Sequence, residues 1–279
     1  MDLVSRISEF IERTSSSLPD DVERAIGRAL RREGRGGSAA VVLRTVLDNC
    51  ALARERGVPL CQDTGTLAFY VHESLRRRVT VGLLKRAVAD ATARGFLRKN
   101  CIDSVTGESY DDNCADGAPC VRYVDWGRRG TVTLVMKGGG SENMSRQYSL
   151  PDAGLGAGRD LEGVRRCLLD AVHRTQGYGC APGILGVCIG GDRATGYEVA
   201  KEQLLRSLDD VSADTALAKL ERRVLKEANG LGIGPMGLGG RTTLLGVKVA
   251  ARPRVPASFF VTVAYMCWAC RRGVLEVGS

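Results

Sequence analysis

Three of the ten cysteines lie in irregular backbone beside glycine-rich segments, where a thiolate can be exposed and stabilised by main-chain amides. Cys61 precedes Gln-Asp-Thr-Gly, Cys180 follows Gly179 and precedes Ala-Pro-Gly, and Cys267 follows an expected strand and precedes Trp268. Thiolates from separate parts of a chain can act together as the ligands of one metal site. Buried thiols and nucleophiles are the alternatives that this context leaves open.

Six other cysteines have different settings. Helix or strand patterns surround three of them, which we expect to be buried as small hydrophobic side chains: Cys50, Cys167 and Cys188. A polar, turn-rich stretch holds another three, to which we assign no chemical role: Cys101, Cys114 and Cys120.

The only C-x-x-C pair is Cys267–Cys270, and the absence of a second pair argues against a zinc ribbon with four cysteine ligands. In a reducing cytosol, ten cysteines are not expected to form a disulfide framework. Histidine chemistry is limited, because the chain has only His72, at the end of an apolar strand, and His173, within a helix. We interpret both as structural or surface residues, so acid–base work falls to other groups or to a metal.

Glycine is concentrated in four segments that also carry polar or reactive side chains: PLCQDTGT (59–66), KGGGSENMS (137–145), GCAPGILGVCIGGD (179–192) and GLGIGPMGLGGRTT (230–243). Glycine allows a backbone to approach a ligand closely, and glycine-dense loops can present amides to an anion. Residues 232–237 match G-x-G-x-x-G, but they follow an expected helix and Pro235 removes an amide donor. The sequence therefore does not support nucleotide binding.

Helices and strands alternate in the elements that must position these segments. Apolar spacing predicts helices through the first 57 residues and at 80–96, 160–176, 194–207 and 213–229. Dense β-branched and apolar runs predict strands at 67–72, 121–125, 131–136, 184–189, 243–250 and 257–264. Residues 101–120 are expected to form a long loop, which in compact proteins is often functional. The fold class is therefore α/β (mixed α+β), as one domain over residues 1–279 or as two tightly joined lobes.

Composition excludes some classes of protein. The chain has 279 residues, 44% of them hydrophobic, which is enough for a large core. It shows no apolar run of the roughly 18–20 residues that a membrane helix needs, and its N-terminus has no apolar signal region, so we expect a cytoplasmic protein without a membrane partner. The net charge of +8 comes from dispersed basic residues with only 5% aromatics, which favours an anionic small molecule over nucleic acid.

Taken in order along the chain, five motifs resemble the α subunits of class I, oxygen-sensitive fumarases and of the similar L(+)-tartrate dehydratases. The motifs are CQDTG (61–65), KGGGSENMS (137–145), CAPG (180–183), GIGPMGLGGRTT (232–243) and CWA (267–269). The similarity runs over about residues 20–275. It implies the α-type domain of an iron–sulfur hydro-lyase.

The resemblance implies a [4Fe–4S] cluster held by only three cysteines, at the matching positions Cys61, Cys180 and Cys267. Clusters usually take four thiolates, so three leave one iron open. That iron can act as a Lewis acid for a substrate carboxylate and for the hydroxyl that leaves or adds.

The resemblance also implies substrate contacts, from Gln62, Asp63, Arg98, Gly139 and Gly140. Asp63 is the candidate catalytic group that orients water or hydroxyl, and its alternative role is to cap the turn that follows. The family's N-T-G-D-N-T-P loop is Asn-Cys-Ala-Asp-Gly-Ala-Pro at 113–119 here, a departure that leaves the substrate open.

Single-chain members of the family continue into a β-type region beyond the point at which this chain ends. The resemblance therefore implies a separate β subunit, an α–β hetero-oligomer and a small dicarboxylate substrate.

Hydration of fumarate to malate, a reaction of the tricarboxylic acid cycle, is the leading interpretation, and dehydration of L(+)-tartrate to oxaloacetate is the alternative. KGGGSENMS and GGRTT look more like the fumarases, whereas CWACRRG looks closer to the tartrate dehydratases. A metal-bound nucleic-acid module would need paired C-x-x-C knuckles and an aromatic, basic face, and the sequence has neither.

Overall fold

The computed structural model describes residues 2–34 and 36–278, which separate into two compact units. The Asp63 unit comprises residues up to 19, residues 48–139 and residues from 269 onward. The Cys180 unit comprises residues 20–47 and 140–268. Two helices pass from one unit into the other, α3 (Ser38–Arg56) and α5 (Gly139–Asn143).

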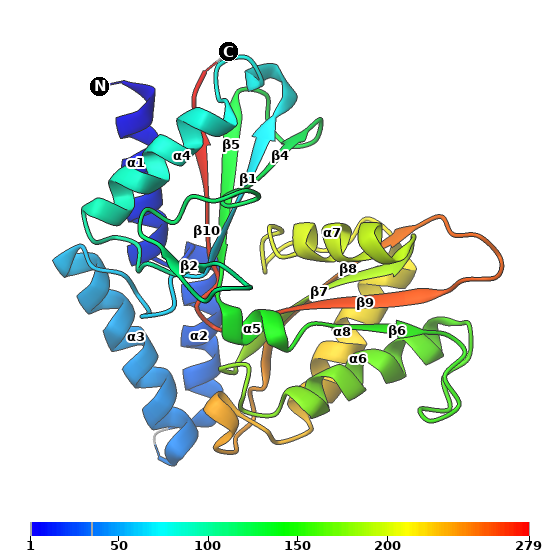
Figure 1. Ribbon diagram of the computed structural model, residues 1–279. Coiled ribbons are helices and arrows are strands. Elements are labelled where there is room, and N and C mark those ends of the chain that lie inside the picture. The colour runs from blue at the N-terminus through cyan, green and yellow to red at the C-terminus, as the bar shows by residue number, and fades with distance from the viewer. Residues whose placement is uncertain (1, 35, 279) are drawn as a thin grey trace. The chain divides into compact units, whose positions relative to one another are not determined.

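The Asp63 unit contains a four-stranded mixed sheet in the order β10-β5-β1-β4 (Figure 1). Its strands are β1 (Thr66–His72), β4 (Cys120–Val124), β5 (Thr131–Lys137) and β10 (Arg271–Glu276). β1 runs parallel to β4 and antiparallel to β5, and β10 is antiparallel to β5. A two-stranded ribbon of β2 (Cys101–Ile102) and β3 (Ser109–Tyr110) and the short 3-10 helix η1 (Glu73–Leu75) complete the unit.

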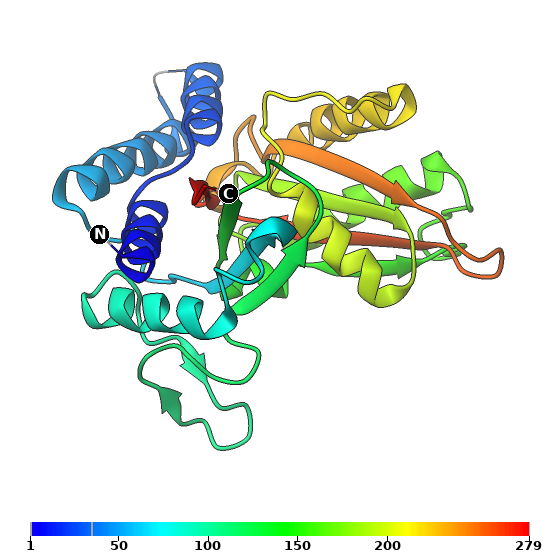
Figure 2. The same cartoon turned by 90° about the horizontal axis from the view of Figure 1, so that it is seen from above.

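Helices α1 (Leu3–Ser16) and α4 (Val81–Ala93) cover one face of this sheet (Figures 1 and 2). Both begin at side-chain caps, because the Asp2 carboxylate accepts from the Ser5 amide at 2.8 Å and the Thr80 hydroxyl from the Leu83 amide at 3.3 Å. Their apolar stripes join alternate strand residues in one core. That core includes Ile7, Phe10, Leu84, Val88, Phe69 and Leu134.

The Cys180 unit also contains a four-stranded mixed sheet, in the order β6-β9-β7-β8. Its strands are β6 (Arg146–Ser149), β7 (Gly183–Gly190), β8 (Leu244–Arg252) and β9 (Phe260–Met266). β7 is parallel to β8 and antiparallel to β9, which is antiparallel to β6. The unit's helices are α2 (Asp20–Glu33), α6 (Leu161–Thr175), α7 (Arg193–Gln203) and α8 (Thr215–Asn229), with the 3-10 helix η2 (Pro235–Gly237).

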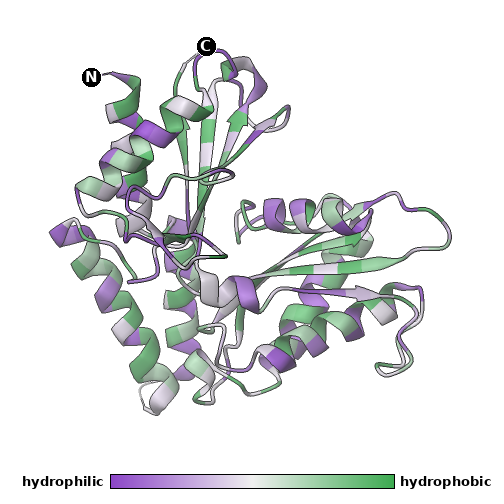
Figure 3. Cartoon of the chain, in the orientation of Figure 1, coloured by the Kyte–Doolittle hydropathy of each residue, from purple (hydrophilic) through white to green (hydrophobic). Residues whose placement is uncertain are grey.

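Opposite faces of this second sheet carry different helices. One face packs its alternate residues Leu185, Val187 and Val247 against α6 and α8 in a continuous core. The other face meets α7, and Gly186 allows the close approach, because a Cβ there would lie 2.1 Å from the Ala200 carbonyl oxygen. In Figure 3 the central strands β7 and β9 are drawn mainly in green and white, as expected for strands covered on both faces.

The mixed α/β class expected from the sequence is confirmed, and most elements lie where the spacing predicts them. The differences are local: α5, β6 and β10 were not predicted, and residues 101–120 hold the β2–β3 ribbon within the expected loop. α5 is too short to show a period, and β6 and β10 are polar segments that form strands by pairing with β9 and β5. Over residues 2–34 and 36–278, no helix is long and apolar enough to cross a membrane.

Candidate functional site

The CQDTG motif forms a loop, residues 61–65, between α3 and β1, which we call the Asp63 loop. The half-buried Cys61 has its Sγ 3.7 Å from the Gln62 Oε1. Gly65 adopts φ +76°, and a Cβ at this position would lie 2.6 Å from the Lys137 carbonyl group. Glycine is therefore required here, because it lets the loop rest directly on the end of β5.

A buried arginine supports the Asp63 loop from β10. The Arg271 side chain, in a residue only 1% exposed, donates from Nη2 to the Asp63 carbonyl oxygen at 2.7 Å. Its Nε and Nη1 atoms are buried and have no hydrogen-bond partner within the described residues. Buried arginines are rare, and unsatisfied donors on one call for an explanation. Sequence reasoning missed Arg271, although its place just after the CWA motif was a signal.

The glycine run after β5 lies beside the Asp63 carboxylate. A Cβ on Gly138 would lie 2.7 Å from the Asp63 Oδ2, so glycine leaves room for that carboxylate. Gly139 and Gly140 form the first turn of α5, and Gly139 also lines a pocket with Asp63. The structure thus brings Gly138, Gly139 and Asp63 together within one unit.

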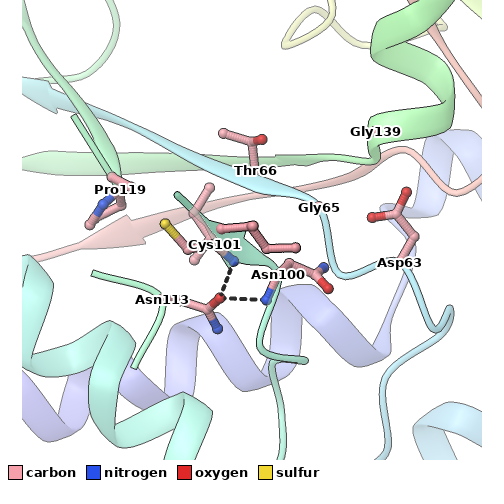
Figure 4. A pocket seen from close by; sticks show the side chains of 11 residues that line it. Asp63, Gly65, Thr66, Asn100, Cys101, Asn113, Pro119 and Gly139 are labelled. Carbon is pink, nitrogen blue, oxygen red and sulfur yellow. Dashed lines mark hydrogen bonds between the residues drawn. The ribbon is translucent and has the colours of Figure 1, made fainter. Parts of the chain in front are cut away.

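That pocket has a volume of about 350 Å³ and lies wholly in the Asp63 unit (Figure 4). Its wall includes Asp63, Thr66, Asn100, Asn113 and Gly139. Figure 4 shows the amide side chain of Asn113 hydrogen-bonded to the main chain of residues 100 and 101. Residues from separate chain segments line this one cavity, and Asp63, Thr66 and Asn100 bring polar groups to its wall, as in many small-molecule sites.

Arg98 is held beside this pocket by its backbone. Its amide donates to the Thr64 hydroxyl at 3.1 Å, and its carbonyl accepts from the Asn113 Nδ2 at 2.9 Å. The residue itself is exposed. The structure therefore connects the main chain of Arg98 to the Asp63 loop and to Asn113.

The two expected ligand cysteines of the Cys180 unit lie on neighbouring segments. Cys180 is exposed, precedes β7 and adopts φ +50°, and Cys267 is half-buried and directly follows β9. The Trp268 amide donates to the Cys180 carbonyl oxygen at 3.3 Å, so the two segments touch. A non-glycine residue at positive φ costs about 1–3 kcal/mol, and such residues cluster at functional sites.

The Tyr265 side chain packs against Gly179 and Gly183, the glycines on either side of the Cys180 segment. A Cβ on Gly179 would lie 2.4 Å from its ring, and one on Gly183 would lie 2.2 Å from its hydroxyl oxygen. Burial raises the pKa of Tyr265 well above its usual value, and the nearby Cys267 and Cys180 thiols raise it further. The phenol therefore stays neutral, and both thiols interact electrostatically with it.

Among the described residues, no group of three or more His, Cys, Asp or Glu side chains stands ready to hold a metal ion. Cys180 and Cys267 belong to one unit and Cys61 to the other. The structure brings together two of the three expected ligands, and a site that combines all three stays a prediction.

The structure separates these loop cysteines from the core cysteines. Cys50, Cys167 and Cys188 are fully buried, which confirms the sequence interpretation. Burial raises the pKa of Cys167 to about 12 and that of Cys188 to about 11. Both thiols are therefore protonated and unreactive near neutral pH.

Residues 232–237, which match the dinucleotide pattern, end a helix rather than begin one. They follow α8, Gly234 adopts φ +69°, and the segment passes into η2. The Met236 amide donates to the Ala181 carbonyl oxygen at 2.9 Å. These glycines therefore support the Cys180 segment, and the pattern has no phosphate-binding geometry.

The fold and these loops define a mixed α/β protein that displays thiols and a glycine-flanked aspartate beside the strands of two sheets. The chain belongs to the fumarate hydratase (fumerase) family, whose model matches residues 4–276. This confirms the resemblance seen in the sequence motifs.

Relatives of this chain fall under two descriptions. It is 49% identical to a putative class I fumarate hydratase of Geobacillus stearothermophilus over 97% of its own length and 54% of that protein. It is 31% identical to a putative L(+)-tartrate dehydratase subunit alpha of Methanocaldococcus jannaschii, over 97% of this chain and 96% of the relative. An Escherichia coli K12 L(+)-tartrate dehydratase subunit alpha is 28% identical, with 99% and 90% covered. The chain thus spans about half of the first relative and nearly all of the other two.

Proposed function

We propose that this chain is the α-type part of an iron–sulfur hydro-lyase that converts fumarate to malate and works in the cytosol. The observation that carries the proposal is that, in a chain of this family, some cysteines lie on loops while others are buried in the core. Cys61, Cys180 and Cys267 lie on loops outside the hydrophobic cores, whereas Cys167 and Cys188 are buried within the Cys180 unit.

The donor set fits an iron–sulfur cluster. Cys180 is exposed beside Cys267, both lie in irregular backbone, and all three expected ligands are sulfur atoms, the ligand type that such clusters take. Cys61, Cys180 and Cys267 would hold a [4Fe–4S] cluster. When bound, it would supply one iron without a cysteine ligand, a Lewis acid for the carboxylate and hydroxyl of the substrate.

The chain's own polar residues would bind and orient the dicarboxylate. Arg98 would pair with a carboxylate, and Gln62 would donate to an oxygen atom of the substrate. The Asp63 carboxylate, which lies on the pocket wall, would orient the water or hydroxyl group. Main-chain amides at Gly139 and Gly140 would add uncharged donors to the same anion.

A separate β subunit is the partner that we propose, in an α–β hetero-oligomer. The relatives that this chain covers at 96% and 90% of their length are described as alpha subunits, which supports a division of the enzyme between chains. The Geobacillus relative, of which it covers 54%, is about twice as long. The proposal therefore places part of the substrate-binding and catalytic machinery outside this chain.

L(+)-tartrate is the alternative substrate, and one observation favours it. The two relatives that match this chain almost end to end are described as tartrate dehydratase subunits. Against it stands the higher identity, 49%, to the putative fumarate hydratase. Both substrates are hydroxy-diacids or their dehydration products, so the same carboxylate-binding residues serve either.

A paired assay tests the proposal. The chain is co-expressed with its β partner and reconstituted without oxygen, and turnover is measured on fumarate, malate and L(+)-tartrate. We expect the larger kcat/KM on fumarate and malate, and a loss of at least about a hundredfold in kcat for Asp63→Asn. A larger kcat/KM on L(+)-tartrate would establish the alternative substrate. If the complex turned over none of the three substrates, the hydro-lyase proposal would be refuted. Full activity of this chain without the β partner would refute the division of the enzyme between two chains.

A further inference from the structure

Asn113 is a buried amide whose hydrogen-bonding capacity is entirely used. It is 7% exposed, and its Oδ1 accepts from the Asn100 amide at 2.8 Å and from the Cys101 amide at 3.0 Å. Its Nδ2 donates to the Thr92 hydroxyl at 3.1 Å and to the Arg98 carbonyl at 2.9 Å. An asparagine side chain can make four such bonds, and all four are made here.

The backbone at Asn113 also selects this residue type. Its φ is +60°, a left-handed conformation that asparagine adopts more readily than most residues. Few other side chains can both tolerate this backbone and present two donors and two acceptors. The position therefore serves the main chain of residues 98–101 rather than the open volume of the pocket.

Thr64 holds the same segment from the opposite side. This residue is 2% exposed, and its hydroxyl oxygen accepts from the Arg98 amide at 3.1 Å and from the Asn100 Nδ2 at 3.0 Å. Thr64 directly follows Asp63 in the chain, so these bonds tie the Asp63 loop to residues 98–100. Both backbone polar groups of Arg98 are thus held by buried side chains, while the residue itself is exposed.

We propose that Thr64 and Asn113 are positioning residues that fix Arg98 relative to Asp63 for binding of the dicarboxylate. This inference rests on the proposed function of Arg98. The physical reason is preorganisation: a guanidinium on a long, exposed side chain aims at a carboxylate only as accurately as its backbone is held. The side-chain polar atoms of Asn113 are fully occupied, and the Thr64 hydroxyl oxygen already accepts two hydrogen bonds, so neither residue needs to touch the substrate.

The experiment compares isosteric variants in the reconstituted α–β complex. Thr64→Val removes the hydroxyl at constant shape, and Asn113→Asp keeps the Oδ1 acceptor but removes the donor to the Arg98 carbonyl. We expect each to raise KM for the preferred dicarboxylate about tenfold and to change kcat less than about threefold, because binding geometry is lost and the reacting groups are kept. Thr64→Ser restores the hydroxyl and should return KM to within about twofold of the wild type.

A matched control separates positioning from general stability. Thr14→Val removes a buried threonine hydroxyl that donates to the Phe10 carbonyl at 2.7 Å within α1 and makes no hydrogen bond to residues 98–113 in the described structure. It should lower Tm as much as Thr64→Val does and leave KM unchanged. Hydrogen–deuterium exchange of residues 97–101 gives a readout that needs no turnover, and Thr64→Val should accelerate it about tenfold while Thr14→Val should not.

The outcomes distinguish this inference from the proposed function. The positioning inference would be overturned if Thr64→Val kept the wild-type KM while Arg98→Lys raised KM. It would also be overturned if Thr64→Val did not accelerate hydrogen exchange at residues 97–101. An unchanged KM in Arg98→Lys would also overturn it while leaving the hydro-lyase assignment in place. If the complex turns over neither fumarate nor tartrate, the proposed function fails, and the exchange measurement alone then decides whether Thr64 fastens the Arg98 segment.

Discussion

The Asp63 unit and the Cys180 unit contain sheets with the same sequence of pairings. In each, an edge strand lies parallel to a central strand, followed by two antiparallel neighbours: β4-β1-β5-β10 in one and β8-β7-β9-β6 in the other. Both functional loops include a close glycine contact, but the other contacts that hold them differ. Hydrogen bonds that the buried Thr64 hydroxyl accepts and that the buried Arg271 donates hold the Asp63 loop, whereas Gly179 and Gly183 let the Cys180 segment pack against the Tyr265 ring.

This difference predicts which amino-acid substitutions each loop tolerates. A loop held by buried hydrogen bonds is sensitive to the loss of a polar atom, since the unpaired partner remains buried. A loop held by close packing is sensitive to added volume, because interiors are packed as densely as organic crystals. Substitutions that alter only polarity or only volume should therefore affect the two units unequally.

The cysteine ligands provide the largest expected effect. We expect Cys180→Ser, Cys267→Ser and Cys61→Ser each to abolish the visible absorption and most of the bound iron, about four atoms in the reconstituted wild type, because each leaves only two of the three proposed thiolate ligands. Anaerobic reconstitution followed by absorption spectroscopy and iron analysis measures this. Cys120→Ser, at another half-buried cysteine, should keep the colour. A fully coloured Cys180→Ser protein would remove that residue from the ligand set.

Two glycine variants should separate steric from polar fastening. Gly183→Ala should lower the free energy of unfolding by about 1–3 kcal/mol, because its Cβ would overlap the buried Tyr265. Gly138→Ala meets only the end of the Asp63 side chain, so we expect turnover to fall while stability changes by less than about 1 kcal/mol.

Urea unfolding and steady-state kinetics measure both. Gly82→Ala is the control, because an added Cβ there meets nothing within 4 Å in the described structure, and alanine in α4 should be neutral or stabilising. Equal stability losses in Gly183→Ala and Gly138→Ala would contradict the contrast between the two units.

The smallest effect concerns pH. The pKa values of Cys167 and Cys188 are raised by burial to about 12 and about 11, so the folded state disfavours their thiolates. A raised folded pKa gives stability that is fully present below the unfolded value and is lost as pH rises toward the folded value. We expect the free energy of unfolding to fall by about 1 kcal/mol per thiol between pH 8 and pH 10.

Urea unfolding at pH 8, 9 and 10 measures this slope for the wild type and for Cys188→Ala. The variant should be less stable at every pH and show a shallower slope, since alanine cannot ionise. An unchanged slope in Cys188→Ala would contradict the raised pKa of the buried Cys188 thiol as a source of the pH dependence.

The sequence by itself determined much of this protein. Capping residues and apolar spacing located most helices, and β-branched runs located the central strands, because these signals are local. The family followed from short motifs in a fixed order, and the burial of Cys50, Cys167 and Cys188 followed from their helix and strand settings. Residue type and neighbouring residues were sufficient for each of these inferences.

Only the tertiary structure revealed how the Asp63 loop is held. Thr64 and Arg98 are 34 positions apart, and Asp63 and Arg271 are 208 positions apart, so no local pattern connects them. The polar strands β6 and β10 likewise exist because β9 and β5 offer them partners. Hydrogen bonds between distant segments form only when the fold brings a donor and an acceptor together, and that placement decided which polar residues support the candidate site.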